Sequence, residues 1–247
     1  DKTVKENLLH ILNEKYGIKE EDFLSAELSL VPAFKARDIG FDRALIGAYG
    51  HDDRVCSYPA FSALFDTETD GKTVMVVLAD KEEIGSEGTT GMQCAIFTDL
   101  IDAIAYSFDT TSAVIRANSK CLSADVNAAY DPNFKDVNEP MNSTYVSCGA
   151  GLTKFTGARG KSGSNDASAE FMAEVRKMFN DEGVIWQTGE LGKVDQGGGG
   201  TVAKYIAKMN IDTVDIGVAV VSMHAPYEVI SKADVYEMYL ACKAFMK

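Results

Sequence analysis

Thr73-Val-Met-Val-Val-Leu-Ala79 runs directly into Asp80-Lys-Glu-Glu-Ile-Gly-Ser-Glu-Gly-Thr-Thr-Gly91, and the change of character at residue 80 decides the fold. The first segment has the length and β-branched content of a buried strand. The second turns on glycines and carries two adjacent acids, Glu82 and Glu83. Apolar residues at helical spacing resume from Cys94 to Ile104. The stretch therefore predicts a strand, a turn and a helix of an α/β domain, with two carboxylates where such domains place ligand sites.

The overall composition limits the kind of protein. The chain has 247 residues, 46% of them hydrophobic, which is enough for one sizeable core, alone or with a small appendage. Its formal net charge is −13, and such an acidic surface disfavours nucleic acid and anionic membranes as partners. No apolar run reaches the roughly 20 residues of a membrane-spanning helix. The five cysteines are dispersed, which is typical of reduced cysteines in a cytoplasmic protein.

The remaining segments alternate between strand-like and helix-like patterns, which is the rhythm of an α/β fold. Apolar side chains also alternate from Leu24 to Leu30 and predict a strand over 23–31 that Pro32 ends. Ser231 and Asp234 form a capping-box pattern at the start of the last helix. Other strands are expected near 45–49, 122–126, 149–155, 184–187 and 214–221, and other helices near 4–12, 56–65, 94–106, 167–179 and 201–209.

Acidic residues and a histidine lie at the ends of several apolar runs. Carboxylates together with imidazole suit zinc, cobalt or manganese. Two adjacent carboxylates in such a place could have different tasks, one holding a metal and the other moving a proton. Each residue taken alone is more often a solvated acid or a structural histidine, so only the set carries weight. The set comprises Asp52, Glu82, Glu83, Asp125 and His224.

Five motifs, in order along the chain, resemble those of the aspartyl aminopeptidase and vacuolar aminopeptidase I family. That family consists of dinuclear zinc exopeptidases. The motifs are His51-Asp-Asp-Arg-Val-Cys-Ser57, Asp80-Lys-Glu-Glu-Ile-Gly-Ser86, Leu122-Ser-Ala-Asp125, Asp195-Gln-Gly-Gly-Gly-Gly-Thr201 and Ser222-Met-His224.

The resemblance implies a three-layer α/β/α zinc-exopeptidase fold with a mixed central sheet. Residues 41–247 would form the carboxyl-terminal portion of the metallopeptidase domain, incomplete at its amino-terminal side. Residues 1–40 would be the remnant of an inserted oligomerisation domain. The expected assembly is a homo-oligomer such as a dodecamer.

The resemblance also implies roles for individual residues. Asp52 would bridge two divalent metal ions, most simply zinc, with cobalt or manganese as alternatives. Glu83 and His224 would complete one metal site, Asp125 would bind the other ion, and Glu82 would be the general base. The loops 157–165 and 197–201 would wall the substrate pocket, with the binding residues Arg159, Lys161, Gly199, Gly200 and Thr201.

One departure from the family concerns a metal-ligand histidine in an amino-terminal His-x-Asp segment. The chain has three histidines, and neither His10 nor His51 matches that ligand. The function that the resemblance implies is an aminopeptidase that releases acidic or neutral amino-terminal residues from peptides. A separate amino-terminal polypeptide is one way to supply the missing ligand. The alternatives are an inactive fragment or assembly subunit of such an enzyme, and a related dimetal deacylase.

Overall fold

The computed structural model describes residues 3–159 and 162–247, and the chain divides into two compact units, Asp1–Ala33 and Phe34–Lys247. The first unit contains helix α1 (Val4–Tyr16) and a 3-10 turn, η1 (Glu20–Leu24). A capping box between Thr3 and Glu6 starts α1, and Gly17 ends it in the left-handed conformation. The helix buries none of its residues.

The strand expected over 23–31 is not formed. Residues 20–24 make the 3-10 turn, and 26–36 have no regular structure. Leu24 and Leu30 are 90% and 100% exposed. Alternating apolar residues form a strand only beside a neighbouring strand, and within its own unit this segment has none.

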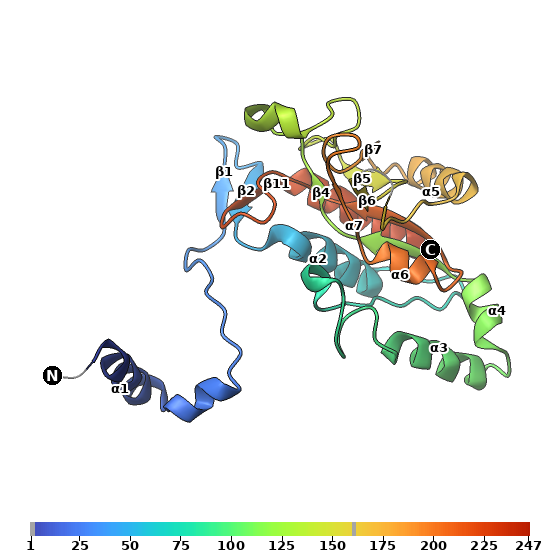
Figure 1. Cartoon of the computed structure of the whole chain (residues 1–247). Coiled ribbons are helices and arrows are strands. Elements are labelled where there is room, and N and C mark those ends of the chain that lie inside the picture. The colour runs from blue at the N-terminus through green and yellow to red at the C-terminus, as the bar shows by residue number, and fades with distance from the viewer. Residues whose placement is uncertain (1–2, 160–161) are drawn as a thin grey trace. The chain divides into compact units, whose positions relative to one another are not determined.

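A four-stranded mixed sheet forms the centre of the second unit, in the order β3-β9-β5-β7. Figure 1 labels β5 and β7 of this sheet. The strands are β3 (Lys120–Ala124), β9 (Asp212–Gly217), β5 (Ala150–Thr153) and β7 (Trp186–Thr188). Strand β9 runs parallel to β3 and antiparallel to β5, and β5 runs parallel to β7. The sheet thus has the mixed α/β topology that the sequence predicted.

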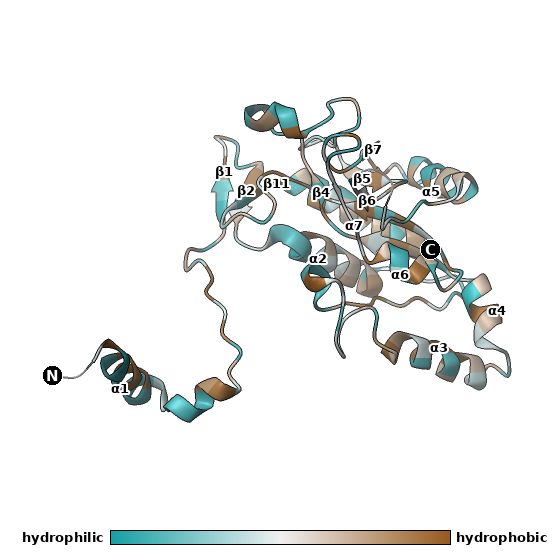
Figure 2. Cartoon of the chain, in the orientation of Figure 1, coloured by the Kyte–Doolittle hydropathy of each residue, from teal (hydrophilic) through white to brown (hydrophobic). Residues whose placement is uncertain are grey.

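Alternation along these strands gives the sheet two different faces. Leu122, Val214 and Ile216 belong to the main core, which also holds residues of α2 (His51–Asp66), α5 (Ala169–Asp181) and α7 (Lys232–Met246). Cys121 belongs instead to a second core with residues of α3 (Ile96–Ser107), α4 (Ser112–Ala117) and α6 (Ala203–Ala207). Polar and apolar residues alternate on the covering helices α3 and α5 (Figure 2). The second unit therefore has helices on both faces of the sheet.

Three smaller sheets carry the loops around the site. Strands β1 (Arg37–Ile39), β2 (Leu45–Ala48) and β11 (Glu228–Ser231) form an antiparallel sheet. Strand β10 (Ala219–Val220) pairs in parallel with β4 (Asn127–Ala128), and β6 (Gly157–Ala158) pairs antiparallel with β8 (Gly198–Gly199). The other short elements are the 3-10 turns η2 (Glu82–Ile84) and η3 (Pro132–Val137).

The segment 73–79, which was expected to be a buried strand, is neither a strand nor fully buried. Val74 and Val76 pack against the main core, whereas Met75 and Val77 are 41% and 46% exposed. No ladder pairing joins these residues to another described segment, and the first bridge is the parallel pair Asp80–Gly91. The expected strand is thus an extended segment, because a strand requires a hydrogen-bonded neighbour.

The start of α7 also differs from the sequence prediction. Ser231 is the N-cap residue, but its side chain makes no capping hydrogen bond. Asp234 is fully buried and accepts hydrogen bonds from the backbone N–H groups of Ser147 and Gly149. The acid thus fixes a distant loop and does not close a capping box. No helix in the described part of the chain is long and apolar enough to cross a membrane.

Candidate metal centre

Asp52 lies at the point where β2 turns into α2. Gly50, with a φ of 71°, makes this turn in the left-handed region that glycine enters without strain. His51 is buried, and its Nε2 lies 3.2 Å from the carbonyl oxygen of Ile46. Burial lowers the pKa of His51. His51 therefore supports the loop, as expected for a structural histidine. The neighbouring Asp52 is partly buried.

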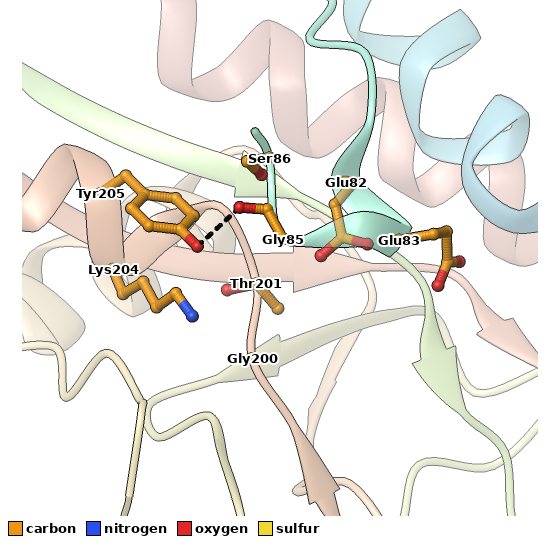
Figure 3. A pocket seen from close by; sticks show the side chains of 8 residues that line it. All are labelled: Glu82, Glu83, Gly85, Ser86, Gly200, Thr201, Lys204 and Tyr205. Carbon is orange, nitrogen blue, oxygen red and sulfur yellow. Dashed lines mark hydrogen bonds between the residues drawn. The ribbon is translucent and has the colours of Figure 1, made fainter. Parts of the chain in front are cut away.

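The two glutamates share one short turn but occupy different surroundings. Lys81 and Gly85, with φ of 63° and 88°, flank η2 in the left-handed conformation. Glu82 is half-buried and Glu83 is exposed. Figure 3 shows the Glu82 carboxylate between the turn and Thr201, and the Glu83 carboxylate farther from Thr201. A tight irregular turn thus separates the two neighbouring side chains.

His224 brings together residues that are far apart in the chain. Its Nε2 lies 3.0 Å from Asp52 Oδ2 and 3.0 Å from Glu83 Oε1. His224 follows β10, and its φ of 65° is in the left-handed region. Ligand atoms of these three residues lie within 4.8 Å of one another. They form the first of two groups that could hold a metal ion.

The second group shares Asp52 with the first. It contains Asp52, Asp53 and Asp125, again with ligand atoms within 4.8 Å of one another. Asp125 directly follows β3, and Asp53 Oδ1 accepts a hydrogen bond from the N–H of Val126. Asp52 is thus the carboxylate common to both groups.

Burial and mutual repulsion raise the pKa values of these acids. Burial, and next the charge of Glu83, raises the pKa of Asp52 to about 6. The same two causes raise the pKa of Glu82. The pKa values of Asp53 and Asp125 are also raised, first by burial and then by a neighbouring aspartate. Cations within such a cluster would offset this repulsion.

The donor atoms fit divalent metal ions. Zinc binds histidine nitrogen and carboxylate oxygen at about 2.0–2.2 Å, which places ligands of one ion about 3–4 Å apart. The two contacts of His224 are of this size. One site would be held by Asp52, Glu83 and His224, and the other by Asp52 and Asp125 with Asp53 beside them.

A pocket of about 240 Å³ opens beside the base candidate Glu82. Gly200, Thr201, Lys204 and Tyr205 line it from the side of α6 (Figure 3). The Tyr205 hydroxyl donates a hydrogen bond of 3.1 Å to the carbonyl oxygen of Gly85 and so ties α6 to the η2 turn. The remaining lining residues are Glu83, Gly85 and Ser86.

The two loops expected to wall a substrate pocket do contact each other. Gly157 pairs with Gly199, and the N–H of Arg159 donates to the carbonyl oxygen of Gly197 at 3.0 Å. Gly200 and Thr201 reach the pocket, whereas Gly199 and Arg159 are not among its lining residues. Lys161 lies outside the described residues.

Three residues at the site were not predicted from the sequence, namely Asp53, Lys204 and Tyr205. Asp53 is next to Asp52 in the same motif. A search for neighbouring acids, the pattern that indicated Glu82 and Glu83, would therefore have identified it. Lys204 and Tyr205 gave no comparable signal, because basic and aromatic residues on a short helix are common. Their proximity to Glu82 and Gly85 depends on the tertiary structure.

Fold and site together define a class of protein. Carboxylates and a histidine converge at loops that follow strands of a mixed α/β domain, and a glutamate with a raised pKa lies beside them. This arrangement is typical of metal-dependent hydrolases.

The comparisons with known proteins identify the family. The model of the "Aminopeptidase I zinc metalloprotease (M18)" family matches residues 1–246. The chain belongs to this family. It is 50% identical over 247 residues to a probable M18 family aminopeptidase 1 of Clostridium acetobutylicum, covering 98% of this chain and 53% of that protein. The corresponding protein of Thermotoga maritima is 48% identical, with 99% and 55% covered.

Solved structures agree with this assignment. The crystal structure of aminopeptidase I from Clostridium acetobutylicum matches with a TM-score of 0.93 and 50% identity, covering 99% of this chain and 53% of that one. A structure of a Saccharomyces cerevisiae protein, described as a dodecamer, shares the fold at a TM-score of 0.72 and 24% identity, with 97% and 54% covered. The chain spans about half the length of the relatives it matches.

Proposed function

We propose that the protein is a metallo-aminopeptidase with two divalent metal ions, most simply zinc, and with Glu82 as the general base. The observation that carries the proposal is the sharing of Asp52 between two potential ligand groups, with Glu82 close enough to residues of both to affect their pKa values or be affected by them. The membership of an aminopeptidase family that is described as zinc metalloproteases supports it.

The residues of the site would have separate roles in the reaction. Bound zinc supplies Lewis-acid polarisation of the scissile carbonyl and lowers the pKa of water. Glu82, whose pKa burial raises, takes the proton of the attacking water and passes it to the leaving amine. The exposed acid Glu83 and the partly buried Asp52 hold His224 from two sides.

The substrate would be a peptide with a free amino terminus. The acidic groups near the centre would attract that ammonium group. Among the described residues, Lys204 is the cation that lines the pocket, and it lies close enough to Glu82 to lower the pKa of Glu82 slightly against the larger opposing effects. We infer that Lys204 extends acceptance to acidic amino-terminal residues, a role that the sequence had suggested for Arg159 and Lys161. A neutral amino-terminal residue of the substrate needs no contact with Lys204.

The test is hydrolysis by the whole protein loaded with zinc. Aminoacyl amides should be cleaved, and Glu82→Gln should lower kcat by about 10²–10⁴-fold while the zinc content stays unchanged. Cleavage of N-acyl amino acids alone would favour the related deacylase. Bound zinc without any hydrolysis would favour the inactive assembly subunit. Retained turnover in Glu82→Gln would remove Glu82 as the base.

We also propose that the protein forms a homo-oligomer and that residues 1–40 contribute to its interface. Helix α1 buries nothing within its own unit, and Leu24, Leu28 and Leu30 are exposed there. Exposed apolar surface of this kind marks an interaction site. Leu30→Glu should therefore lower the oligomeric mass measured by sedimentation, and an unchanged mass would exclude this leucine from the interface. A separate amino-terminal polypeptide finds no support in the comparisons.

A further inference from the structure

Glu228 is a buried carboxylate that contacts two distant loops. It is the first residue of β11 and is 2% exposed. Its Oε2 accepts a hydrogen bond of 3.1 Å from the N–H of Asp52, and its Oε1 accepts one of 2.9 Å from the N–H of His224. One side chain therefore holds the backbone of two metal-ligand candidates that are 172 positions apart in the sequence.

These loops need such support because their backbones are irregular. Ser222 and His224 both have φ above 60°, a region that residues with a Cβ seldom adopt without external constraint. The chain reaches Asp52 through Gly50, also in the left-handed region. No ladder pairing holds Asp52 or His224 in the described structure. The two bonds to Glu228 fix both backbones at the positions where their side chains meet.

The chemistry of Glu228 suits this task. A buried carboxylate is costly unless its oxygens accept hydrogen bonds, and bonds to a charged acceptor are stronger than neutral ones. No lysine or arginine in the described part of the chain forms an ion pair with Glu228. Both of its oxygens instead accept backbone N–H groups from the two loops.

We propose that Glu228 is a positioning residue of the metal centre, which sets the distance between Asp52 and His224 by holding both backbones. This role rests on the proposed metal function, because the distance between Asp52 and His224 matters only if both residues bind an ion. Glu228 itself is not proposed as a metal ligand, because its two carboxylate oxygens already accept hydrogen bonds from the N–H groups of Asp52 and His224.

The chain offers a matched control in Asp234. This carboxylate is also fully buried and also accepts two backbone N–H groups, those of Ser147 and Gly149, at 2.7 and 2.8 Å. Neither of these residues belongs to the ligand groups. Asp234→Asn therefore perturbs a similar buried carboxylate away from the metal centre, whereas Glu228→Gln perturbs the one within it.

The first measurement is amide hydrogen exchange in metal-free protein, which needs no bound ion. In Glu228→Gln the amide of Asp52 or that of His224 should exchange about tenfold faster or more, because an NH₂ group replaces one of the two acceptor oxygens. In Asp234→Asn the faster exchange should be confined to 147–149. Unchanged exchange at both Asp52 and His224 in Glu228→Gln would overturn the proposal.

The second measurement is zinc affinity by competition with a chromophoric chelator. Loss of a group that orients metal ligands typically weakens binding by about 10–100-fold, and we expect this for Glu228→Gln. Asp234→Asn should lower thermal stability and leave zinc affinity unchanged. Wild-type affinity in Glu228→Gln, with the loss of stability seen in Asp234→Asn, would reduce Glu228 to a structural residue.

A second variant covers the case in which Glu228→Gln does not fold. Glu228→Asp keeps the charge but shortens the reach, so it can no longer hold both loops, and it should also lose zinc affinity. Wild-type exchange at Asp52 and His224 in that variant would overturn the proposal. If the wild-type protein bound no zinc, the proposed metal function would fail, and the exchange measurement would still decide the role of Glu228.

Discussion

Asp215→Asn should remove a loss of folding stability that grows as the pH rises. Asp215 lies on the central strand β9, is 2% exposed, and faces the loop that carries Thr201. Burial raises its pKa to about 6, although Thr201 and Ser123 oppose that increase. Neither carboxylate oxygen has a partner with normal hydrogen-bond geometry in the described structure, and neither do those two hydroxyls. Burial therefore outweighs the hydroxyl contacts.

The magnitude follows from that pKa. The difference of about two pK units from the usual aspartate value corresponds to about 3 kcal/mol. Because the folded protein holds the proton more tightly, the contribution of Asp215 to stability is greatest below about pH 4 and falls as the pH rises through 6. Asparagine does not ionise, so the stability of the variant relative to wild type should rise by about 3 kcal/mol between pH 4 and pH 7.

Urea unfolding of chelator-treated wild type and variant at pH 4, 5, 6 and 7 would measure this difference. Comparing the two proteins at each pH cancels the other acids that titrate in the same range. Asp212→Asn removes an exposed carboxyl group from the same strand and serves as the control, with no comparable change expected. A stability difference for Asp215→Asn that is constant with pH, or that falls as the pH rises, would refute the reasoning.

Three further predictions concern the site itself. Glu83→Ala should lose most bound zinc, whereas Glu82→Ala should keep it, as metal analysis of the dialysed proteins would show; equal losses would contradict separate roles. Lys204→Met should raise KM for glutamyl amides several-fold more than for leucyl amides, and an equal effect on both would exclude a charge-specific contact. Gly217→Ala should destabilise the protein by about 1–3 kcal/mol in urea unfolding, because its Cβ would lie 1.7 Å from the carbonyl oxygen of Asp125; unchanged stability would show that β3 yields easily.

The sequence predicted those parts of the fold in which local pattern and tertiary pairing agree. The apolar runs near 122–126 and 214–221 became β3 and β9, which have neighbours on the sheet. The equally apolar 73–79 stayed extended without a ladder, and the alternating 23–31 formed no strand. Alternation shows which residues suit a strand, but the hydrogen-bonded neighbour is a property of the assembled structure.

The candidate site could be predicted only as a set of separate residues. Asp52, Asp125 and His224 were suggested because each follows or ends an apolar run. Their proximity could not be predicted, because these residues are far apart in the sequence. Glu228 gave no signal as a residue of the site, because a glutamate at the start of a strand is ordinarily exposed. Its role depends on N–H groups from two loops that the sequence places far apart.

The proposed base and the proposed metal ligands therefore have different supports, and this has a consequence for the proposed function. Asp52 and His224 are tied to a fully buried side chain, Glu228, on the β2–β11 sheet. The η2 turn with Glu82 is held by the Asp80–Gly91 bridge and by exposed hydrogen bonds, among them those from Tyr205 and Gln93 to the carbonyl oxygen of Gly85. Local stability follows burial, so the turn should open more readily than the ligand loops. As the proposed base, Glu82 would then adjust to the attacking water while the Asp52–His224 pair keeps its geometry.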